Sequence, residues 1–558
     1  MKLPCTILFY IIGIGCVFYC TAHPEATPPV GKIRGSILHS RLGKKIYSFR
    51  GIRYAEPPTG ERRFEIATPA ADWNDDVFDA SKEGPACPNV QKTQLMSEDC
   101  LRLNVYTTKL PTKGEDVKRS VLVFFHPGAF YFLSAQSFNF GPEYLMDKDI
   151  VLVTTNYRLG SLGFISTGDA SAPGNLGLKD QVIALRWVQR NIGAFGGDPN
   201  SVAISGGSIG ALTAMLHVVS PMSKNLFHRA IVMSGSLLTA EPYPTEQNVL
   251  AKKQARLLNC TTDSSRAMLT CLKSKPVDSF INTMADFFEW HRDPIVIWKP
   301  VVEREIAGVE RFLPAQPVDL IKQGKFHQVP VILGITKDEF GAVVVAFEKQ
   351  TRNGDDMYSD MNDNWNRIAP ISFMYERGTS RSEYISKELR KFYFDNQRIS
   401  PATDVGLARI YADSVVIFPS YRVAKLIAEN SKAPLYLYKF TYQGCCSFMM
   451  WNASTPYGVA HQDDLQYLFF MENFFPYFDT TAPENPMVEL CTSIWTSFAQ
   501  TGEPLPKSGI KWNRFIPEEN NYLEINLTPV MRNGLYPDRM QEWEKLFPLS
   551  SPSQTVSN

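Results

Sequence analysis

A serine between glycines is the sharpest chemical signal in the chain. Residues 206–210 read GGSIG, directly after an apolar, β-branched segment and directly before a helical pattern. This is the strand–turn–helix context of a nucleophile elbow, in which small residues allow a tight reversal that lifts the serine above the sheet. Free N–H groups at the start of the following helix favour negative charge that develops on a reacting ester. We therefore predict that Ser208 is a nucleophile of acyl transfer.

A serine hydroxyl needs a base that takes its proton and an acid that holds this base. In this kind of site the chain order is serine, acid, histidine. The histidines that follow the helix after Ser208 are His228, His291, His327 and His461. We choose His461 as the base, because it follows a small-residue turn and precedes a helical pattern, which places it on a loop. The strand pattern from residue 329 ends in Asp338 and Glu339, and either acid fits the third role.

The negative ester oxygen of the intermediate needs backbone N–H donors, one after the serine and others from an upstream loop. That loop reads HPGAF from His126 and follows a strong strand pattern. Pro127 has no N–H and cannot donate. The candidates for the oxyanion hole are therefore Gly128, Ala129 and Ile209.

Short apolar runs rich in β-branched residues predict the strands that position these groups. They begin at Val121, Val151, Val202, Ala230 and Val329. Continuous apolar runs suit strands that are buried on both faces. Between the second and third runs, the stripe of an amphipathic helix is formed by Leu178, Val182, Leu185, Val188 and Ile192. Strand, helix, strand predicts an α/β fold with a large, mostly parallel, twisted sheet and helices on both faces, with a helical insertion from about 349 to 396.

The N-terminus predicts export. Residues 1–22 have the layout of a signal peptide, with an apolar run from Ile7 to Cys20 before small residues. This run is shorter than the roughly 20 residues that span a bilayer, and the C-terminus has no GPI-type signal. We expect a secreted protein without a stable membrane anchor, with a single domain over residues 23–550 and a flexible tail at 551–558.

The charge balance argues against a polyanionic partner. Lys plus Arg and Asp plus Glu are equal at 57 each, without long runs of one sign, so we expect no nucleic-acid partner. The eight histidines are scattered, and no Cys or His group has the spacing of metal ligands. We therefore expect no metal and no cofactor, and the oligomeric state stays open.

Seven of the ten cysteines lie beyond the predicted signal peptide. In an oxidising compartment, pairs that are close in sequence with polar residues between them are natural bridges. These pairs are Cys87 with Cys100 and Cys260 with Cys271, each closing a loop worth about 2–3 kcal/mol in the chain-entropy model. The remaining three, Cys445, Cys446 and Cys491, leave at least one thiol unpaired.

Three N-x-S/T tripeptides are candidate glycosylation sites in an exported protein. Their acceptors are Asn452, Asn259 and Asn526. The last two are weaker candidates, because Cys260 lies inside one tripeptide and Pro529 follows the other.

Further segments of the chain are typical of one family. They read FRGIRYAEPP, SEDCLRLNVY, NYRLGSLGF, GNLGLKDQ, FGGDP, SPMSKNLFHRAI and FAQTGEP. In this order the chain resembles the type-B carboxylesterase/cholinesterase family over almost its whole mature length. Its loops are most similar to those of secreted insect carboxylesterases, including juvenile-hormone-esterase-like enzymes. The resemblance implies the α/β-hydrolase fold and a secreted serine carboxylesterase that cleaves small-molecule esters through an acyl-enzyme.

The resemblance also implies roles for single residues. It selects Glu339 over Asp338 and so gives the triad Ser208, Glu339 and His461. It implies the same oxyanion hole and the same two disulfides. It further implies structural ion pairs, which are Arg50 with Glu98 and Arg158 with Asp180.

Two departures from the family pattern bear on the substrate. The elbow carries Gly207 and Ile209 where an acidic or polar residue and an alanine are usual, and Ala129 replaces a common glycine. Residues 88–99 contain no tryptophan, so a choline ester, which is bound by cation–π contact, is disfavoured. Two alternatives stay open: a catalytically weak or inactive binding or adhesion protein, which the unusual elbow favours, and a dedicated hormone or pheromone esterase.

Overall fold

The computed structural model describes residues 23–549, except residues 74–75, 93–94, 113, 355, 453–454 and 507–508. The predicted signal peptide at residues 1–22 and the predicted tail at 551–558 lie outside the described residues.

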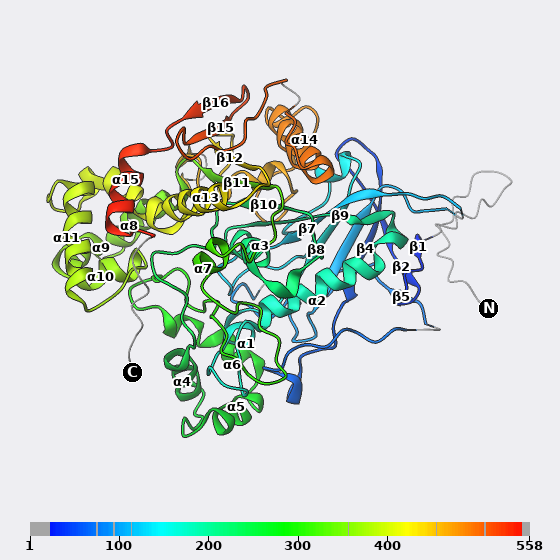
Figure 1. Ribbon diagram of the computed structural model, residues 1–558, viewed down its shortest axis with the longest axis horizontal. Coiled ribbons are helices and arrows are strands. Elements are labelled where there is room, and N and C mark those ends of the chain that lie inside the picture. Colours follow the sequence, from blue (N-terminus) through cyan, green and yellow to red (C-terminus); the bar gives the residue numbers. More distant parts are fainter. Residues whose placement is uncertain are drawn as a thin grey trace.

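A large mixed sheet organises the chain (Figure 1). Its strands are β3 (Ser36–His39), β4 (Lys45–Arg53), β6 (Arg102–Thr107), β7 (Arg119–Phe125), β8 (Val151–Thr155), β9 (Gly197–Gly207), β10 (Arg229–Met233), β11 (Val331–Thr336), β12 (Leu435–Phe440), β15 (Asn521–Ile525) and β16 (Val530–Asn533). Within the described residues their spatial order is β16-β15-β12-β11-β10-β9-β7-β8-β6-β4-β3. Neighbours from β8 to β15 are parallel, and antiparallel pairs complete both edges.

Two smaller sheets flank the main one. Strands β1 (Glu25–Ala26), β2 (Ile33–Arg34) and β5 (Phe78–Asp79) form the first, and β13 (Met450–Asn452) pairs with β14 (Thr455–Pro456) in the second. The β13–β14 hairpin lies in the chain between β12 and the predicted catalytic histidine.

The five predicted strands are confirmed, and they form the parallel centre of the sheet as β8, β7, β9, β10 and β11. Strand β11 begins at Val331, later than predicted, because Pro330 has no N–H for the ladder. Alternate side chains of β7 enter different cores: Val123 and Phe125 pack on one face of the sheet, and Leu122 and Phe124 on the other. This alternation explains the continuous apolar run, since both faces are buried.

Helices cover both faces of the sheet. They are α1 (Gly160–Phe164), α2 (Leu176–Asn191), α3 (Ile209–Val219), α4 (Asn248–Leu257), α5 (Ser265–Lys273), α6 (Val277–Asn282), α7 (Pro317–Lys322), α8 (Val343–Arg352), α9 (Met357–Asp363), α10 (Trp365–Ser372), α11 (Ser380–Phe394), α12 (Asp404–Ala412), α13 (Phe418–Asn430), α14 (Asn485–Thr501) and α15 (Pro537–Leu546). Apolar side chains of α2, α3 and α13 belong to one core, and those of α14 belong to the core on the opposite face. Figure 1 shows α14 and α2 on opposite sides of the strands.

The predicted insertion is helical, as expected. Helices α8 to α11 lie beside one another at the end of the molecule that also holds α15 (Figure 1). The predicted stripe on α2 is buried, and its last member, Ile192, lies in a 3-10 turn directly after the helix.

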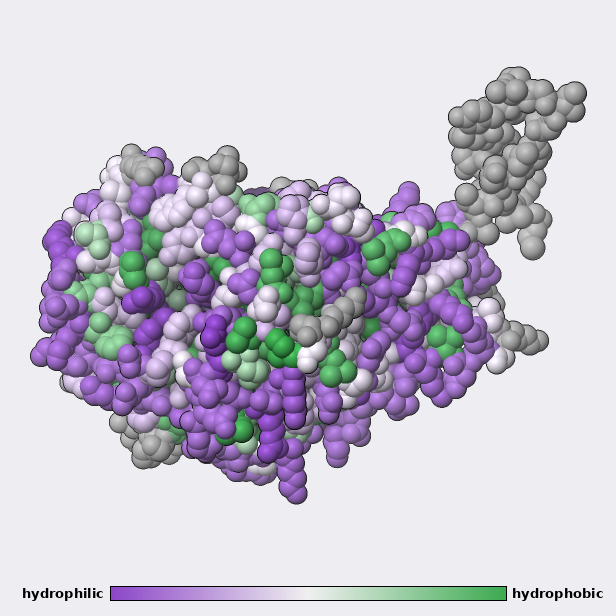
Figure 2. Space-filling model, turned by 90° about the horizontal axis from the view of Figure 1, so that it is seen from above, coloured by the Kyte–Doolittle hydropathy of each residue, from purple (hydrophilic) through white to green (hydrophobic). Residues whose placement is uncertain are grey.

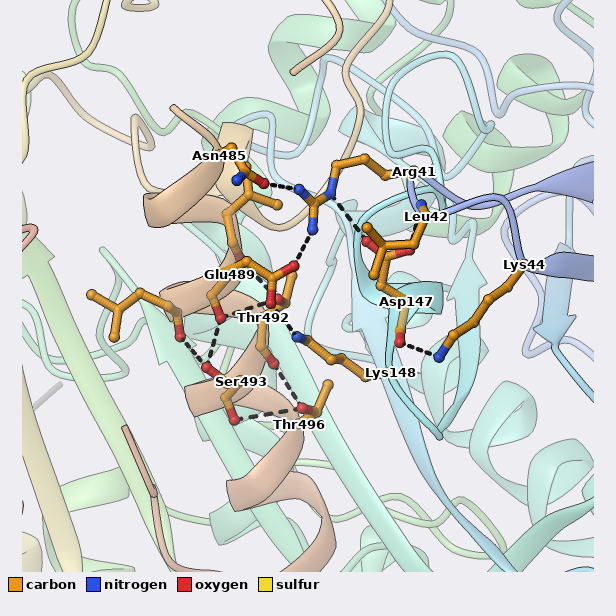
Figure 3. A network of polar contacts seen from close by, with 12 residues as sticks. Arg41, Leu42, Lys44, Asp147, Lys148, Asn485, Glu489, Thr492, Ser493 and Thr496 are labelled. Carbon is orange, nitrogen blue, oxygen red and sulfur yellow. Dashed lines mark hydrogen bonds and ion pairs between the residues drawn. The ribbon is translucent and has the colours of Figure 1, made fainter. Parts of the chain in front are cut away.

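A buried ionic network ties the edge of the sheet to α14 (Figure 3). Arg41, in the turn between β3 and β4, donates from Nε to Asp147 Oδ2 at 3.0 Å. Its two other guanidinium nitrogens contact Asn485 and Glu489 on α14. Lys148 contacts Glu489 from the other side, at 2.9 Å. Because the guanidinium is fully buried, these partners must all be present to offset the loss of its hydration.

One of the two implied ion pairs is confirmed and the other is wrong. Arg158 and Asp180 form a buried bidentate pair, with nitrogen–oxygen distances of 2.8 and 2.6 Å. Arg50 instead contacts Glu83, at 3.0 Å. Glu98 is occupied by another guanidinium, that of Arg63, through two bonds of 2.6 Å. Arg63 also donates to the carbonyl oxygens of Leu272, Lys273 and Lys275.

The face shown in Figure 2 is mostly hydrophilic, with apolar residues gathered in separate groups. The most exposed large apolar side chains, Val249, Leu95 and Val405, lie on different segments, which is ordinary for a folded surface. Within the described ranges, none of the helices combines the length and the apolar composition that crossing a membrane requires.

Candidate active site

Ser208 lies in a strained turn between β9 and α3. Its backbone has φ +53° and ψ −119°, a conformation that a serine adopts only where its surroundings impose it. A Cβ on Gly206 would lie 2.2 Å from the carbonyl carbon of Gly210, and one on Gly210 would lie 2.1 Å from Phe125 O. The two glycines are therefore required because the elbow packs against itself and against the end of β7. The Ser208 N–H donates to Met233 O at 2.8 Å, which fixes the turn to β10.

The predicted base and acid meet the serine in one hydrogen-bonded line. His461 Nε2 lies 2.8 Å from Ser208 Oγ, and His461 Nδ1 lies 2.5 Å from Glu339 Oε2. An ionised carboxylate only accepts hydrogen bonds, so we assign the proton to Nδ1, which leaves Nε2 free to accept the serine proton. Glu339 is fully buried, and its other oxygen accepts from the Thr336 N–H at 2.7 Å. The Glu339 backbone oxygen also accepts from the His461 N–H at 3.2 Å.

The neighbouring acid has a different partner. Asp338 Oδ2 accepts from the Val459 N–H at 2.8 Å, and the Asp338 N–H donates to Val459 O at 3.0 Å. Asp338 therefore ties the end of β11 to the backbone of the loop that follows β14 and carries His461, the histidine loop. Glu339 is the acid that contacts the imidazole.

The three predicted oxyanion donors lie in a turn after β7 and at the start of α3, where backbone N–H groups have no partner within a strand or helix. Gly128, Ala129 and Phe130 have consecutive positive φ values of +120°, +50° and +66°, and such turns gather their N–H groups on one side. A Cβ on Gly128 would lie 2.0 Å from Phe132 O, so only glycine fits there. Ile209 is the first residue of α3, where the backbone N–H has no partner within the helix.

Sequence reasoning did not identify the residues that hold the oxyanion loop. Tyr157, in the segment NYRLGSLGF, donates from its hydroxyl to His126 O at 2.8 Å, and the two rings stack at 4.6 Å. His126 Nδ1 lies 2.8 Å from Pro127 O, and because a carbonyl only accepts, this nitrogen carries the proton. Complete burial lowers the pKa of His126 to about 4, so the ring is neutral. It supports the loop without placing a charge near the serine.

A second missed residue is Asp463, two positions after the histidine. Its Oδ2 accepts from the Ala460 N–H at 2.7 Å and from Ser447 Oγ at 2.6 Å, and its Oδ1 accepts from the Phe448 N–H at 2.8 Å. Burial raises the pKa of Asp463 to about 7. This carboxyl group therefore links the segment that carries His461 to the segment that follows β12. No sequence pattern revealed this link, because it joins two loops.

Apolar side chains fill the space beside the reacting groups. The Phe340 ring lies 4.0 Å from the His461 imidazole. A Cβ on Gly207 would lie 2.9 Å from Leu465 Cδ1, and Leu465 is fully buried. The Leu465 side chain therefore packs directly against the elbow at Gly207.

The structure joins Cys87 to Cys100 and Cys260 to Cys271, with S–S distances of 1.99 and 2.00 Å. Cys445, Cys446 and Cys491 are unbridged. Among the described residues, no group of three or more histidine, cysteine, aspartate or glutamate side chains is placed to hold a metal ion.

The glycosylation candidates differ in their surroundings. Asn259 is exposed. Asn526 is half-buried and its amide donates to Thr441, which disfavours a glycan there. The side chain of Asn452 lies outside the described residues.

A mostly parallel sheet with a serine turn after one central strand, an acid after a second and a histidine on a later loop is the architecture of the α/β-hydrolases. The chain belongs to the carboxylesterase family, whose profile matches residues 22–543.

Similar proteins support this classification. Esterase FE4 of Myzus persicae is 36% identical over 531 residues, which cover 92% of this chain and 91% of that protein. A juvenile hormone esterase of Tribolium castaneum is 32% identical, over 94% of this chain and 92% of its own length. Among solved structures, the juvenile hormone esterase of Manduca sexta with covalently attached OTFP has a TM-score of 0.84 at 29% identity, and the match covers 94% of this chain and 100% of that one. The protein is therefore a carboxylic ester hydrolase.

Proposed function

We propose that the protein is an exported serine carboxylesterase that hydrolyses small-molecule esters through an acyl-enzyme at Ser208. The hydrogen-bonded line from Ser208 through His461 to the buried Glu339 carries this proposal. The covalently attached OTFP in the Manduca sexta juvenile hormone esterase supports a nucleophilic mechanism in the family. The signal-peptide layout of residues 1–22 and the two disulfides support export.

In the proposed reaction, Ser208 Oγ attacks the ester carbonyl while His461 Nε2 takes the hydroxyl proton. The Glu339 carboxylate holds the imidazole in the required tautomer and stabilises the imidazolium. The N–H groups of Gly128, Ala129 and Ile209 stabilise the tetrahedral oxyanion. The imidazolium then protonates the leaving alcohol, and water cleaves the acyl-enzyme by the same proton transfers in reverse order.

We infer that the substrates are uncharged esters. The Phe340 ring, which lies against the His461 imidazole, is apolar, and residues 88–99 contain no tryptophan for a choline group. The hydrogen-bonded contacts among Ser208, His461 and Glu339 favour a hydrolase over the inactive binding protein considered above.

The test is Ser208→Ala together with a fluorophosphonate probe. We expect the purified variant to be secreted with an unchanged melting temperature and to lose at least about a thousandfold in ester hydrolysis. The probe labels the wild-type peptide that contains Ser208 and leaves the variant unlabelled. Substantial turnover by the variant, or a label on another serine, would contradict the assignment.

A further inference from the structure

Two adjacent cysteines lie on the segment that links β12 to the histidine loop. Cys445 is exposed and Cys446 is half-buried, and their sulfur atoms lie 2.8 Å apart. The third unbridged cysteine, Cys491, is fully buried and donates to Met487 Sδ at 3.6 Å. Cys445 and Cys446 are therefore the unbridged cysteines whose sulfur atoms already lie near bonding distance.

We propose that Cys445 and Cys446 form a redox modification site, at which the two neighbouring thiols close into a vicinal disulfide in the exported protein. The proposal rests on export, which is part of the proposed function. The oxidant is a small disulfide such as oxidised glutathione. One cysteine sulfur attacks this disulfide and releases one thiol, and the second cysteine then displaces the other. Two protein S–H bonds are replaced by one S–S bond, and the two electrons and two protons pass to the small disulfide, which becomes two thiols.

Such a bridge is more easily reduced than the other two. Adjacent Cα atoms are about 3.8 Å apart across a trans peptide, which is shorter than the usual Cα–Cα range of disulfides, about 4.4–6.8 Å. Cys87–Cys100 and Cys260–Cys271 lie within that range, at 4.8 and 5.6 Å. Strained disulfides have more oxidising potentials and are the labile ones. We therefore expect the vicinal disulfide to have a higher reduction potential, and so to open under milder reducing conditions, than Cys87–Cys100 or Cys260–Cys271.

The surroundings of the pair slow its closure at neutral pH. Partial burial, the Cys446 thiol and the Glu484 carboxylate raise the pKa of Cys445 well above its usual range, and the Cys445 N–H donates to Glu484 Oε1 at 3.1 Å. The thiol therefore stays protonated and attacks other disulfides slowly. Closure in a test tube needs alkaline buffer and long incubation.

The segment that carries the pair is connected to the proposed active site by three hydrogen bonds. The carbonyl oxygen of Cys446 accepts from Gln466 Nε2 at 3.2 Å. The next two residues, Ser447 and Phe448, donate to Asp463, whose carboxyl group also binds the Ala460 N–H beside the histidine. Ring closure removes conformational freedom from this segment, so the redox state should alter how firmly the histidine loop is held.

The direct test is the mass of the segment in secreted protein that is acid-quenched, unfolded and alkylated without reduction. Chymotrypsin, which cuts after Tyr442 and Phe448, releases a peptide whose cysteines are Cys445 and Cys446 alone. We expect this peptide to carry no alkyl group and to be lighter by the two thiol hydrogens, while Cys491 is alkylated. Alkylation of both cysteines with the two longer bridges intact would overturn the proposal, as would a covalent dimer joined through Cys445.

A second experiment tests the labile character and the connection to catalysis. In glutathione buffers of increasing reducing poise, we expect the vicinal bridge to open while Cys87–Cys100 persists. In the buffers that open the vicinal bridge and leave Cys87–Cys100 closed, the wild-type kcat should fall at least about twofold. The kcat of the variant Cys445→Ser/Cys446→Ser should stay constant across the same buffers. Simultaneous reduction of all three bridges contradicts the strain argument, and an unchanged wild-type kcat contradicts the connection to the histidine loop. The mass measurement does not depend on esterase activity, so failure of the proposed function is distinguishable.

Discussion

Asp463 offers the sharpest test of how the histidine is held. Its two carboxyl oxygens accept three hydrogen bonds, from the backbone N–H groups of Ala460 and Phe448 and from the Ser447 hydroxyl. In Asp463→Asn the amide nitrogen replaces one of these oxygens and cannot accept. Whichever way the amide turns, at least one buried N–H group faces another donor.

The size of the effect follows from that mismatch. A buried N–H group without an acceptor costs about 1–3 kcal/mol. If the loop that carries His461 shifts to relieve this cost, the same free energy appears in the transition state, and each 1.36 kcal/mol is about a factor of ten in rate. We therefore expect kcat of Asp463→Asn to fall about fivefold to 160-fold, with a smaller change in KM, because Asp463 is buried and acts through the backbone beside His461.

The assay is steady-state hydrolysis of an aryl ester at pH 8.5, where the wild-type carboxyl group is ionised. Ser447→Ala is the matched control, since it removes one donor and leaves both backbone N–H groups bound to the acid. We expect it to lower kcat less than about threefold. Equal kcat values for Asp463→Asn and the wild type, or a larger loss in Ser447→Ala, would refute the reasoning.

Three further predictions concern the triad acid, the residue after the serine and the buried carboxyl group of Glu143. Glu339→Gln should lose at least about a hundredfold in kcat, whereas Asp338→Asn should keep most of the activity, and comparable losses in steady-state assays would show that the wrong acid was chosen. Ile209→Ala should raise kcat/KM for esters with bulkier acyl groups, relative to kcat/KM for acetate esters, by about tenfold. The assay is a series of aryl esters that differ only in acyl size. A ratio that stays constant or moves toward acetate would contradict this prediction. Burial raises the pKa of Glu143 to about 7, so the folded protein keeps a proton that the unfolded chain loses at lower pH. The stability that this proton contributes is lost as pH rises toward and through 7. Glu143→Gln should therefore show a smaller fall in melting temperature between pH 5 and 8 than the wild type, and equal falls would exclude this role.

Much of the fold could be predicted because its physical signals are local. The strands that became β7 to β11 are continuous apolar runs, and such runs arise where both faces of a parallel sheet are buried. The elbow was visible for a similar reason, since Gly206 and Gly210 are required by backbone contacts within a few residues of the serine and at the end of β7.

Other parts of the site depend on contacts between distant segments and could not be predicted. The sequence pattern does not show which of two neighbouring acids, Asp338 or Glu339, points toward the histidine. The family resemblance, not the sequence pattern, selected Glu339. The pairing of Arg50 with Glu98 failed because Arg63, which directly follows the 3-10 turn at residues 60–62, binds the same carboxylate. The role of Asp463 was hidden because two of its three donors, Ser447 and Phe448, precede the β13–β14 hairpin in the chain.

The network around Arg41 has a consequence for the order in which the chain is assembled. Arg41 and its partner Asn485 are separated by 444 residues, and a ribosome adds about 5–20 residues per second. The turn between β3 and β4 therefore waits roughly 20–90 s for its partners on α14. During that interval the guanidinium can be bound only by Asp147, and the edge hairpin is held incompletely. We expect this edge to be among the last parts of the nascent protein to become protected from proteases, although it is among the first to be made.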